Sequence, residues 1–507
     1  MVNNKQFFKQ TDIAILFLFG IYSIYLTVFT LSPFEFSLDY FTEFIGFQTI
    51  TIIKMLFSVK PFDIVSNILL FIPVGIFLCL VIKPWEKDSR YNFKIPLFSG
   101  LFISLIIEFV QLFTGRTTSV IDLVTNTAGT ILGFYLIKNH FIRSGMKIGF
   151  NMFRDKKSFV LTSIFIYSSS LFVLFIMPFR LNSTKNWNSE YSLLLGNETT
   201  SDRPWEGQVY ITAVYDRALN SKEIKNLNNL TENGEASNIR KKMGCVALYK
   251  FSAGEDSIIQ DLSGFKKPLD IKGDDLSWSE GGVDLTNEST IRSVEPANKI
   301  SDAIIQTAQF TVEVWIRTKN LEQTGPARIV TISDGTDQRN FTLAQNQQDI
   351  HFRVRTPITG PNGSRKNLIV KSAFHDHSLH HMVATFHHGV EKLFVDGSQV
   401  GLLRGDIDYL TILLNMGNHL VGKILLLFSL FFPLGLLVYF LFDHMRFILI
   451  LLFLTGFIAV VQSYFYLLCA QPFDRLIFIM VFVASCMALL AGWSVERLKD
   501  EMDSFLI

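Results

Sequence analysis

Eight long apolar segments constrain the fold of this chain more than any other feature. A helix needs about 20 residues to cross the hydrocarbon core of a bilayer, and a chain that is 49% hydrophobic has the composition for several crossings. The first segment is too long for a cleaved signal peptide and lacks a small-residue cleavage site, so we expect it to be retained. We therefore predict an α-helical transmembrane bundle of about eight spans, at 13–31, 63–82, 95–113, 118–137, 158–178, 423–441, 447–468 and 473–493.

Lysine and arginine set the predicted orientation, because they are retained on the cytoplasmic side of short loops. The connections after the second and fourth segments are rich in both residues. With eight spans, both termini are then cytoplasmic, and the long polar insert between the fifth and sixth segments is extracytoplasmic. The residues behind this prediction are Lys83, Lys87, Arg90, Lys94, Lys138, Arg143, Lys147, Arg154, Lys156 and Lys157.

Polar and ionisable side chains occur at the outer ends of the second, third and fourth predicted spans. Six of them form pairs at i,i+3 or i,i+4 spacing, which puts both members of a pair on one helix face. An arginine lies in the turn between the third and fourth spans. Such groups are costly in hydrocarbon unless they find a partner or water, so we predict one polar site from Asp63, Asn67, Glu108, Gln111, Arg116, Asp122 and Asn126.

This polar set has two interpretations. In the functional one, the site receives a lipid head group or an envelope intermediate; Arg116 binds its phosphate or carboxylate, and Glu108 or Asp122 acts as a base. In the structural one, the charges pair and the amides hydrogen-bond, so the set only holds three helices together. In either case Gly129 and Gly133 form a GxxxG pair that lets the fourth span approach a neighbour closely.

Two runs in this region carry a family resemblance. DIVSNILLFIPVG at 63–75 and EFVQLFTGRTTSVIDLVTNTAGTILG at 108–133 resemble the VanZ-like membrane domain, over residues 10–140. The resemblance implies a bacterial inner-membrane protein of a family named for low-level resistance to the glycopeptide antibiotic teicoplanin. It implies no particular reaction, because the family has no settled biochemical mechanism.

The polar insert, residues 190–415, has the alternating apolar and polar pattern of an all-β sandwich. FTVEVWIRT at 310–318 and HMVATFHHGVEKLFVDGSQV at 381–400 are the clearest strands, the latter with an Asp-Gly turn. Together with ALYKFSAGEDSIIQDLSG at 247–264, they resemble the laminin G-like (concanavalin A-like) domain. The resemblance implies a jelly roll that binds glycans or proteins, in some members with calcium.

The order of the insert departs from that family. LLLGNETTSDRPWEGQVYITAVYDRALNSKEI, residues 193–224, resembles the closing part of such a domain, yet it precedes the opening run. We predict a circular permutation in which the closing strands come first, which is tolerated where the natural termini lie close together. The alternative is that 193–235 is the remnant of a lost first copy.

Two metal hypotheses arise in the insert. Calcium bound through Asp261 or Asp396 lacks the number of ligands that calcium takes. Zinc is the alternative for a histidine-dense run, although neighbours on a strand point to opposite faces. The histidines of this run are His375, His377, His380, His381, His387 and His388. We predict no metal and no cofactor, with calcium in the sandwich as the alternative.

Composition and missing motifs narrow the function. A net charge of +1 gives no basic field for nucleic acid, and the chain has no paired-carboxylate strand motif, nucleotide loop or common hydrolase motif. We therefore favour a binding protein over an enzyme.

The predicted protein lies in the cell envelope, contacts membrane lipids, and binds an envelope or extracellular glycan or a protein through its sandwich. It would affect glycopeptide susceptibility or surface polysaccharide. The alternatives are a membrane-embedded enzyme acting on a lipid-linked saccharide or phospholipid, and a structural or sensory receptor. The predicted domains are 10–140 (VanZ-like bundle), 158–178 (fifth helix), 190–415 (sandwich) and 423–493 (three C-terminal spans).

Overall fold

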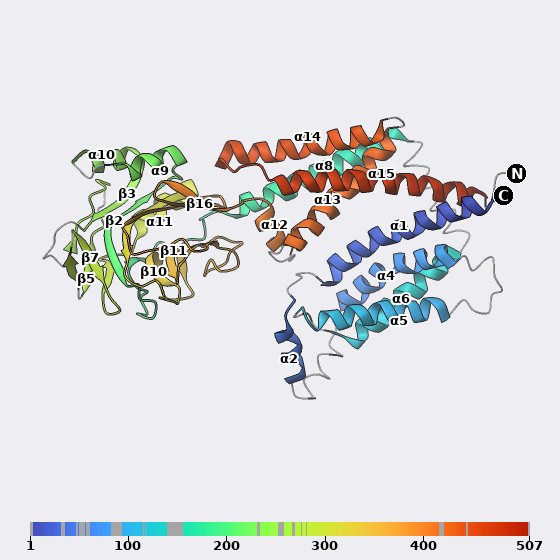
Figure 1. Ribbon diagram of the computed structural model, residues 1–507, viewed down its shortest axis with the longest axis horizontal. Helices are drawn as coiled ribbons and strands as arrows, with labels where there is room; N and C mark the ends of the chain where they lie inside the picture. The colour runs from blue at the N-terminus through green and yellow to red at the C-terminus, as the bar shows by residue number, and fades with distance from the viewer. Residues whose placement is uncertain are drawn as a thin grey trace. The chain divides into compact units, whose positions relative to one another are not determined.

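The chain forms two compact units in the computed structural model, which are described separately (Figure 1). The helical unit comprises Met1–Val173, Leu414–Ser463 and Phe473–Ile507, and the sandwich unit comprises Leu174–Leu413 and Tyr464–Pro472. The structure describes residues 4–31, 36–46, 49, 56, 61–82, 94–114, 116, 118–138, 156–230, 234–251, 258–265, 269–274, 276–279, 281–414, 420–442 and 445–504.

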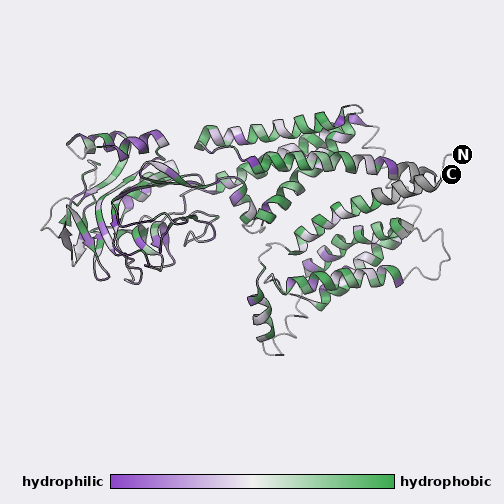
Figure 2. Cartoon of the chain, viewed as in Figure 1, coloured by the Kyte–Doolittle hydropathy of each residue, from purple (hydrophilic) through white to green (hydrophobic). Residues whose placement is uncertain are grey.

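Long apolar helices occupy all eight predicted positions. Six of them, α4, α5, α8, α13, α14 and α15, are long and apolar enough to cross a membrane, whereas α1 and α6 carry shorter apolar stretches (Figure 2). The membrane-helix prediction is therefore confirmed for six helices, and the crossing of α1 and α6 stays a prediction. The helices are α1 (Asn4–Leu31), α4 (Pro61–Ile82), α5 (Lys94–Gln111), α6 (Val120–Lys138), α8 (Lys157–Leu181), α13 (Leu420–Leu441), α14 (Arg446–Cys469) and α15 (Arg475–Ser504).

Three glycines let α4 and α6 pack closely. A Cβ atom added at Gly133 would lie 1.9 Å from the Ile72 carbonyl oxygen, and one at Gly129 would lie 2.4 Å from the Ile68 carbonyl oxygen. From the other helix, a Cβ at Gly75 would lie 2.0 Å from the backbone of α6. The two backbones are thus in contact at the predicted GxxxG pair, as small residues permit in membrane helix pairs.

Replacing Gly133 with alanine should destabilise the helical unit by about 1 to 3 kcal/mol, the range for overpacking a close contact. The obstructing atom is a backbone oxygen, so the helices themselves must separate. Thermal unfolding of the full-length protein in detergent would measure the effect. Gly20→Ala in α1 is the matched control, because no atom of the described residues lies within 4 Å of its added Cβ. Equal midpoints for the two variants would contradict the prediction.

The sandwich unit contains two antiparallel sheets, as predicted. Its first sheet has the order β13-β12-β11-β10-β1-β8-β5-β4, and its second has the order β16-β15-β14-β9-β2-β7-β6, with β3 also paired to β2. The strands are β1 (Ser192–Leu195), β2 (Gly207–Tyr215), β3 (Cys245–Lys250), β4 (Ile258–Ile259), β5 (Ile271–Asp274), β6 (Ser277–Ser279), β7 (Gly282–Leu285), β8 (Thr290–Ser293), β9 (Gln309–Thr318), β10 (Ala327–Ser333), β11 (Arg339–Asn346), β12 (Asp349–Val354), β13 (Leu368–Val370), β14 (His380–His387), β15 (Val390–Val395) and β16 (Ser398–Leu403).

The main hydrophobic core lies between the two sheets and follows the period-two pattern of the sequence. On β9, Phe310, Val312 and Val314 are fully buried in this core. The rings of Phe341 and Phe386, from the first and second sheets, lie 5.2 Å and 5.7 Å from the ring of Phe310. The alternation in 310–318 therefore identified an inward face correctly.

Short helices accompany the strands and were not predicted. In the sandwich unit they are α9 (Ser221–Asn228), α10 (Gly234–Lys242), α11 (Asn298–Thr307) and α12 (Ile407–Leu413), and in the helical unit α2 (Leu38–Gly46) follows α1. Ile224 and Leu227 of α9 join a second apolar cluster with residues of β2, β3, β14 and β15, on the far side of the second sheet from the main core. The all-β description of the insert is thus incomplete.

The segment that joins α14 to α15 also belongs to the sandwich unit. Gln471 is 1% exposed; its side chain accepts from the Gly405 N–H at 2.8 Å and donates to Asp406 at 2.8 Å. Lys392 of β15 donates to the carbonyl oxygens of Cys469 and Ala470 at 3.2 Å and 3.1 Å. This segment is therefore held by hydrogen bonds to the sandwich.

Candidate functional site

The predicted polar residues gather at one end of the helical unit, where α1 and α5 end and α4 and α6 begin. Asn67 of α4 donates its side-chain amide to Asp122 of α6 at 2.9 Å, which joins these two helices directly. Asp63, one turn earlier on α4, is exposed. The two i,i+4 pairs, 63/67 and 122/126, thus place two acids and two amides at this end. Of these four described side chains, Asn67 and Asp122 hydrogen-bond to each other across α4 and α6.

Glu108 lies near the end of α5 and is half-buried. One carboxylate oxygen accepts the backbone N–H of Ser119 at 2.9 Å, just before α6 begins. Asp122 and Arg116 are both within electrostatic range of Glu108. Arg116 donates to the carbonyl oxygens of Phe29 and Thr30, at 2.9 Å and 3.0 Å, so it also ties the turn between α5 and α6 to the end of α1.

The two buried amides face different partners. Gln111 donates to the Thr30 carbonyl oxygen of α1 at 2.8 Å, and Asn126 donates to the Ser104 hydroxyl of α5 at 2.9 Å. They are only 8% and 3% exposed, and neither side-chain carbonyl oxygen has a hydrogen-bond partner among the described residues. A buried amide oxygen without a partner carries a desolvation cost that water or a ligand would relieve.

An apolar cavity of about 410 Å³ adjoins this polar end. It lies against α2, the end of α5 and the start of α6; Phe44, Leu105 and Leu123 are among its lining residues. Of the described residues in its lining, Glu108 alone can carry a charge. The arrangement is an apolar space with the Glu108 carboxylate at its wall, which suits an amphipathic molecule.

Sequence reasoning missed several residues at this end. Ser119 and Ser104 bond to Glu108 and Asn126, and Phe41 of α2 stacks on Phe113 with ring centres 5.0 Å apart. Ser104 lies four residues before Glu108 on α5, so the same i,i+4 search that found the pairs could have included it. The sequence carried no comparable signal for the contact that α2 makes through Phe41. A short amphipathic stretch between apolar segments is hard to distinguish from a loop.

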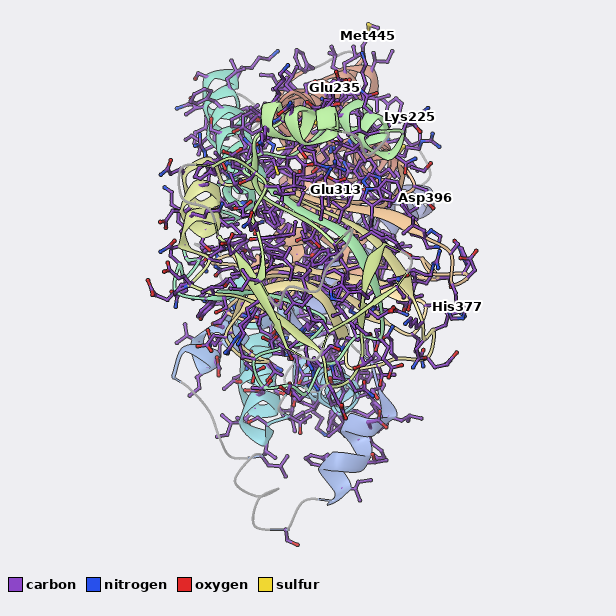
Figure 3. The ribbon with its side chains drawn as sticks, turned by 90° about the vertical axis from the view of Figure 1, so that its left-hand side faces the viewer. Lys225, Glu235, Glu313, His377, Asp396 and Met445 are labelled. Carbon is purple, nitrogen blue, oxygen red and sulfur yellow. The ribbon has the colours of Figure 1, made fainter. Side chains whose placement is uncertain are left out.

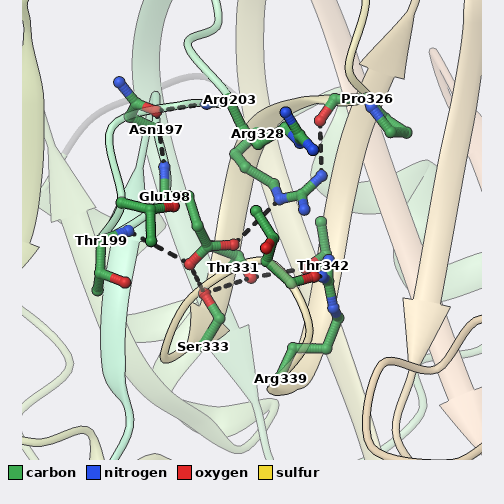
Figure 4. A network of polar contacts seen from close by, with 12 residues as sticks. Asn197, Glu198, Thr199, Arg203, Pro326, Arg328, Thr331, Ser333, Arg339 and Thr342 are labelled. Carbon is green, nitrogen blue, oxygen red and sulfur yellow. Dashed lines mark hydrogen bonds and ion pairs between the residues drawn. The ribbon is translucent and has the colours of Figure 1, made fainter.

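A buried charge network lies on the first sheet of the sandwich (Figure 4). Glu198 is fully buried and bonds to Arg328 of β10 at 3.2 Å and to the Ser333 hydroxyl at 2.5 Å. Arg339 of β11 is also fully buried, and burial, followed by the charges of Arg328 and Arg353, lowers its pKa to about 9. Since a buried ion pair tolerates little displacement, this network holds the chain after β1 against the sheet.

The histidines of the dense run have different partners in the sandwich, although the rings of His387 and His388 lie 5.3 Å apart. His381 is fully buried and stacks on Trp315 with ring centres 4.6 Å apart, whereas His377 projects at the edge of the unit (Figure 3). His380 bonds to Asp396 at 2.9 Å, and His388 stacks on Phe179 with ring centres 4.4 Å apart. His380 and His381, neighbours on β14, thus have different surroundings, in keeping with side chains that point to opposite faces at successive positions.

The carboxylates of both predicted calcium residues accept hydrogen bonds from the protein, although Asp396 is exposed. Asp261 accepts the backbone N–H groups of Leu248 and Leu269, each at 3.1 Å, and pairs with Lys299. Asp396 accepts from the ring of His380 and from a backbone N–H. Within the described ranges, no group of three or more His, Cys, Asp or Glu side chains is arranged to hold a metal ion, and the calcium alternative stays a prediction.

Comparison with known families finds two matching regions in the chain. Residues 17–143 match the VanZ/LLP1 family model, and residues 293–415 match the model of the Concanavalin A-like lectin/glucanases superfamily. No curated protein and no solved structure matches the chain. The two resemblances inferred from sequence are thus found in the same chain, a VanZ-like region and a concanavalin A-like one. With six helices long and apolar enough to cross a membrane, these matches support a multi-pass membrane protein.

Proposed function

We propose that this chain is a bacterial inner-membrane protein that holds an amphipathic envelope lipid in the cavity beside Glu108 and binds a glycan with its sandwich. The observation that carries the lipid-binding part of the proposal is the combination of about 410 Å³ of apolar space with the Glu108 carboxylate at its wall. An apolar chain would fill the space, and a hydroxyl or amine of the head group would donate to Glu108. Charge-assisted hydrogen bonds of this kind are the stronger ones.

The proposed topology has eight crossings, cytoplasmic termini and an extracytoplasmic sandwich. Its support is the hydrogen bonding of the α14–α15 connection to the sandwich through Gln471 and Lys392. In an eight-span chain, the insert after the fifth span and the connection after the seventh lie on the same side of the membrane. The contacts agree with that requirement.

The circular permutation is part of the proposal. β1 lies between β10 and β8 in the first sheet, and β2 lies between β9 and β7 in the second. The segment 193–224 therefore supplies central strands to both sheets of one sandwich. A remnant of a separate copy would not need to occupy the centre of both sheets, so this position favours permutation.

Replacing Glu108 with glutamine should reduce the amount of co-purified lipid about tenfold, because the charge-assisted hydrogen bond to the head group is lost. The measurement is quantitative mass spectrometry of lipids extracted from full-length protein purified in mild detergent. Leu105→Trp, which fills the apolar part of the cavity, should cause the same loss without changing any charge.

The matched control is Phe102→Leu, on the same helix but exposed and outside the described lining of the cavity. It should retain the lipid complement of the unsubstituted protein. If Glu108→Gln and Leu105→Trp also retain that complement, the cavity is not a lipid site.

A further inference from the structure

A second pocket, of about 390 Å³, lies in the sandwich unit beside α11. One wall is the exposed face of that helix, with Asn298, Asp302 and Gln306 at intervals of about one turn. The others are Asp216, directly after β2, and Phe265, in the segment after β4. The described residues of its lining therefore come from three separate parts of the chain.

The lining has the chemistry that sugar hydroxyls require. Carboxylates accept hydrogen bonds, and side-chain amides both donate and accept them, so Asp216, Asp302, Asn298 and Gln306 offer complementary partners to vicinal hydroxyls. Phe265 is 41% exposed, which leaves its apolar ring available to the C–H face of a sugar ring. Burial raises the pKa of Asp216 above its usual value, as expected of a carboxylate that faces a pocket rather than open water.

An ion pair holds the aromatic side of the pocket in place. Lys299 of α11 is 7% exposed; its ammonium pairs with Asp261 and lies 5.4 Å from the centre of the Phe265 ring. Asp261 also accepts the backbone N–H of Ser263 at 2.9 Å. This contact places the Phe265 ring beside α11 in the absence of a ligand, and a contact already made before binding lowers the ordering cost.

The charges of the pocket select among sugars. The Lys299 charge is compensated by Asp261, whereas Asp216 and Asp302 both add negative charge to the lining. Lys241 on α10, close to Gly264, is a cation near this segment but outside the lining. Among the lining residues that the structure describes, the uncompensated charge is negative, which disfavours sugar carboxylates and phosphates.

We infer that this pocket is a binding site for a neutral or amino sugar of an envelope glycan. The inference rests on the proposed glycan binding by the sandwich and specifies its location and charge preference. The volume of about 390 Å³ suits one or two sugar rings.

The test is an array of neutral, amino, uronic-acid and phosphorylated glycans probed with full-length protein in detergent, followed by titration of the bound glycan. Neutral or amino glycans should bind, and acidic ones should not. Phe265→Ala and Gln306→Ala, at exposed positions where folding is not at stake, should each weaken binding about tenfold, as should Asp302→Asn. Asp302→Asn should also improve the relative binding of acidic glycans.

The matched control is Asp376→Asn, an exposed carboxylate of the same unit outside this pocket, which should bind as the unsubstituted protein does. Equal affinity in all pocket variants would overturn the inference while leaving glycan binding by the sandwich intact. A preference for acidic glycans would also overturn it. Absence of binding to every glycan class would overturn both the inference and the proposed function of the sandwich.

Discussion

Replacing Glu313 with glutamine should lower the free energy of unfolding of the sandwich by about 3 to 5 kcal/mol, the cost of breaking a buried ion pair from one side. Glu313 and Arg240 are both fully buried, and the guanidinium bonds to the carboxylate at 2.9 Å and 3.1 Å. The Tyr215 hydroxyl donates to the same carboxylate at 2.5 Å, and His381 lies 3.2 Å from it. Glutamine keeps the shape but removes the negative charge that faces the buried Arg240 guanidinium.

The pKa of Glu313 shows that its buried partners favour the ionised carboxylate over the protonated one. Burial alone would raise the pKa, but the hydrogen bond with His381 and the charge of Arg240 hold it well below its usual value. A carboxyl with a lowered folded pKa stabilises the fold above its unfolded pKa, near 4.5, and this stabilisation is lost as the pH falls further. The deficit of the glutamine variant should therefore be full at pH 7 and shrink below about pH 4.

Urea unfolding of the full-length protein in detergent, followed by tryptophan fluorescence, measures the change in the sandwich. Trp187, Trp205, Trp278 and Trp315 all lie there. Glu322→Gln, an exposed carboxylate in the same unit, is the matched control and should unfold as the unsubstituted protein does. Adding Arg240→Met to Glu313→Gln also removes the buried guanidinium charge and should recover part of the loss. If Glu313→Gln lowered the free energy of unfolding by less than about 1 kcal/mol, the Glu313–Arg240 pair would contribute no more than a surface ion pair does, and the prediction would be wrong.

Hydropathy predicted the membrane helices well because a helix in hydrocarbon must be apolar along its length. It predicted their ends less well. α1 begins at Asn4 rather than near residue 13, and α15 continues to Ser504 rather than ending near 493. Hydropathy identifies the apolar part of a helix. The helix itself continues beyond that part wherever helix-forming residues extend the backbone hydrogen bonding into polar sequence.

In the sandwich, alternation predicted the long strands and turn chemistry predicted one hairpin. Asp396 and Gly397 have φ values of 50° and 77° between β15 and β16, as an Asp-Gly hairpin turn requires. The short helices were missed, although α9 has a readable signal. Asn220 and Glu223 form a capping box at its start, and an N-cap residue followed three positions later by Glu is a helix-start pattern.

The sequence predicted at which end of the helices the polar residues lie, but it did not predict their hydrogen-bond partners. Spacing placed Asn67 and Asp122 at one end of the bundle, and they do bond to each other. Gln111 and Arg116 instead bond to the backbone of α1. A backbone carbonyl exists at every position, so no residue type in the sequence marks such an acceptor.

Replacing Glu391 with glutamine should stabilise the sandwich at pH 8 relative to the unsubstituted protein. Glu391 of β15 is fully buried; its carboxyl accepts the Tyr409 hydroxyl at 3.1 Å and the Leu368 N–H at 3.3 Å. Burial raises its pKa to about 8, from 4.5. The folded protein therefore keeps this carboxyl protonated over a pH range in which the unfolded chain releases the proton.

The sign of the pH dependence follows from linkage between protonation and folding. Below about pH 4.5 both states are protonated, and stability from this group is fully present. It is lost as pH rises toward 8, by up to about 1.4 kcal/mol per pH unit, or about 5 kcal/mol in all. Glutamine is neutral throughout, so the stability difference between variant and unsubstituted protein should grow by about 4 kcal/mol between pH 5 and pH 8.

Urea unfolding of the full-length protein at several pH values measures this difference. His387, whose pKa is lowered to about 4 mainly by burial, makes an opposite contribution near pH 6, but it is present in both proteins and cancels in the comparison. Gln399→Ala, at an exposed site on β16, should keep the pH dependence of the unsubstituted protein. A difference between Glu391→Gln and that protein that stays constant from pH 5 to pH 8 would mean that Glu391 is ionised in the folded sandwich, in which case its burial would have to be relieved by water or by movement of Tyr409.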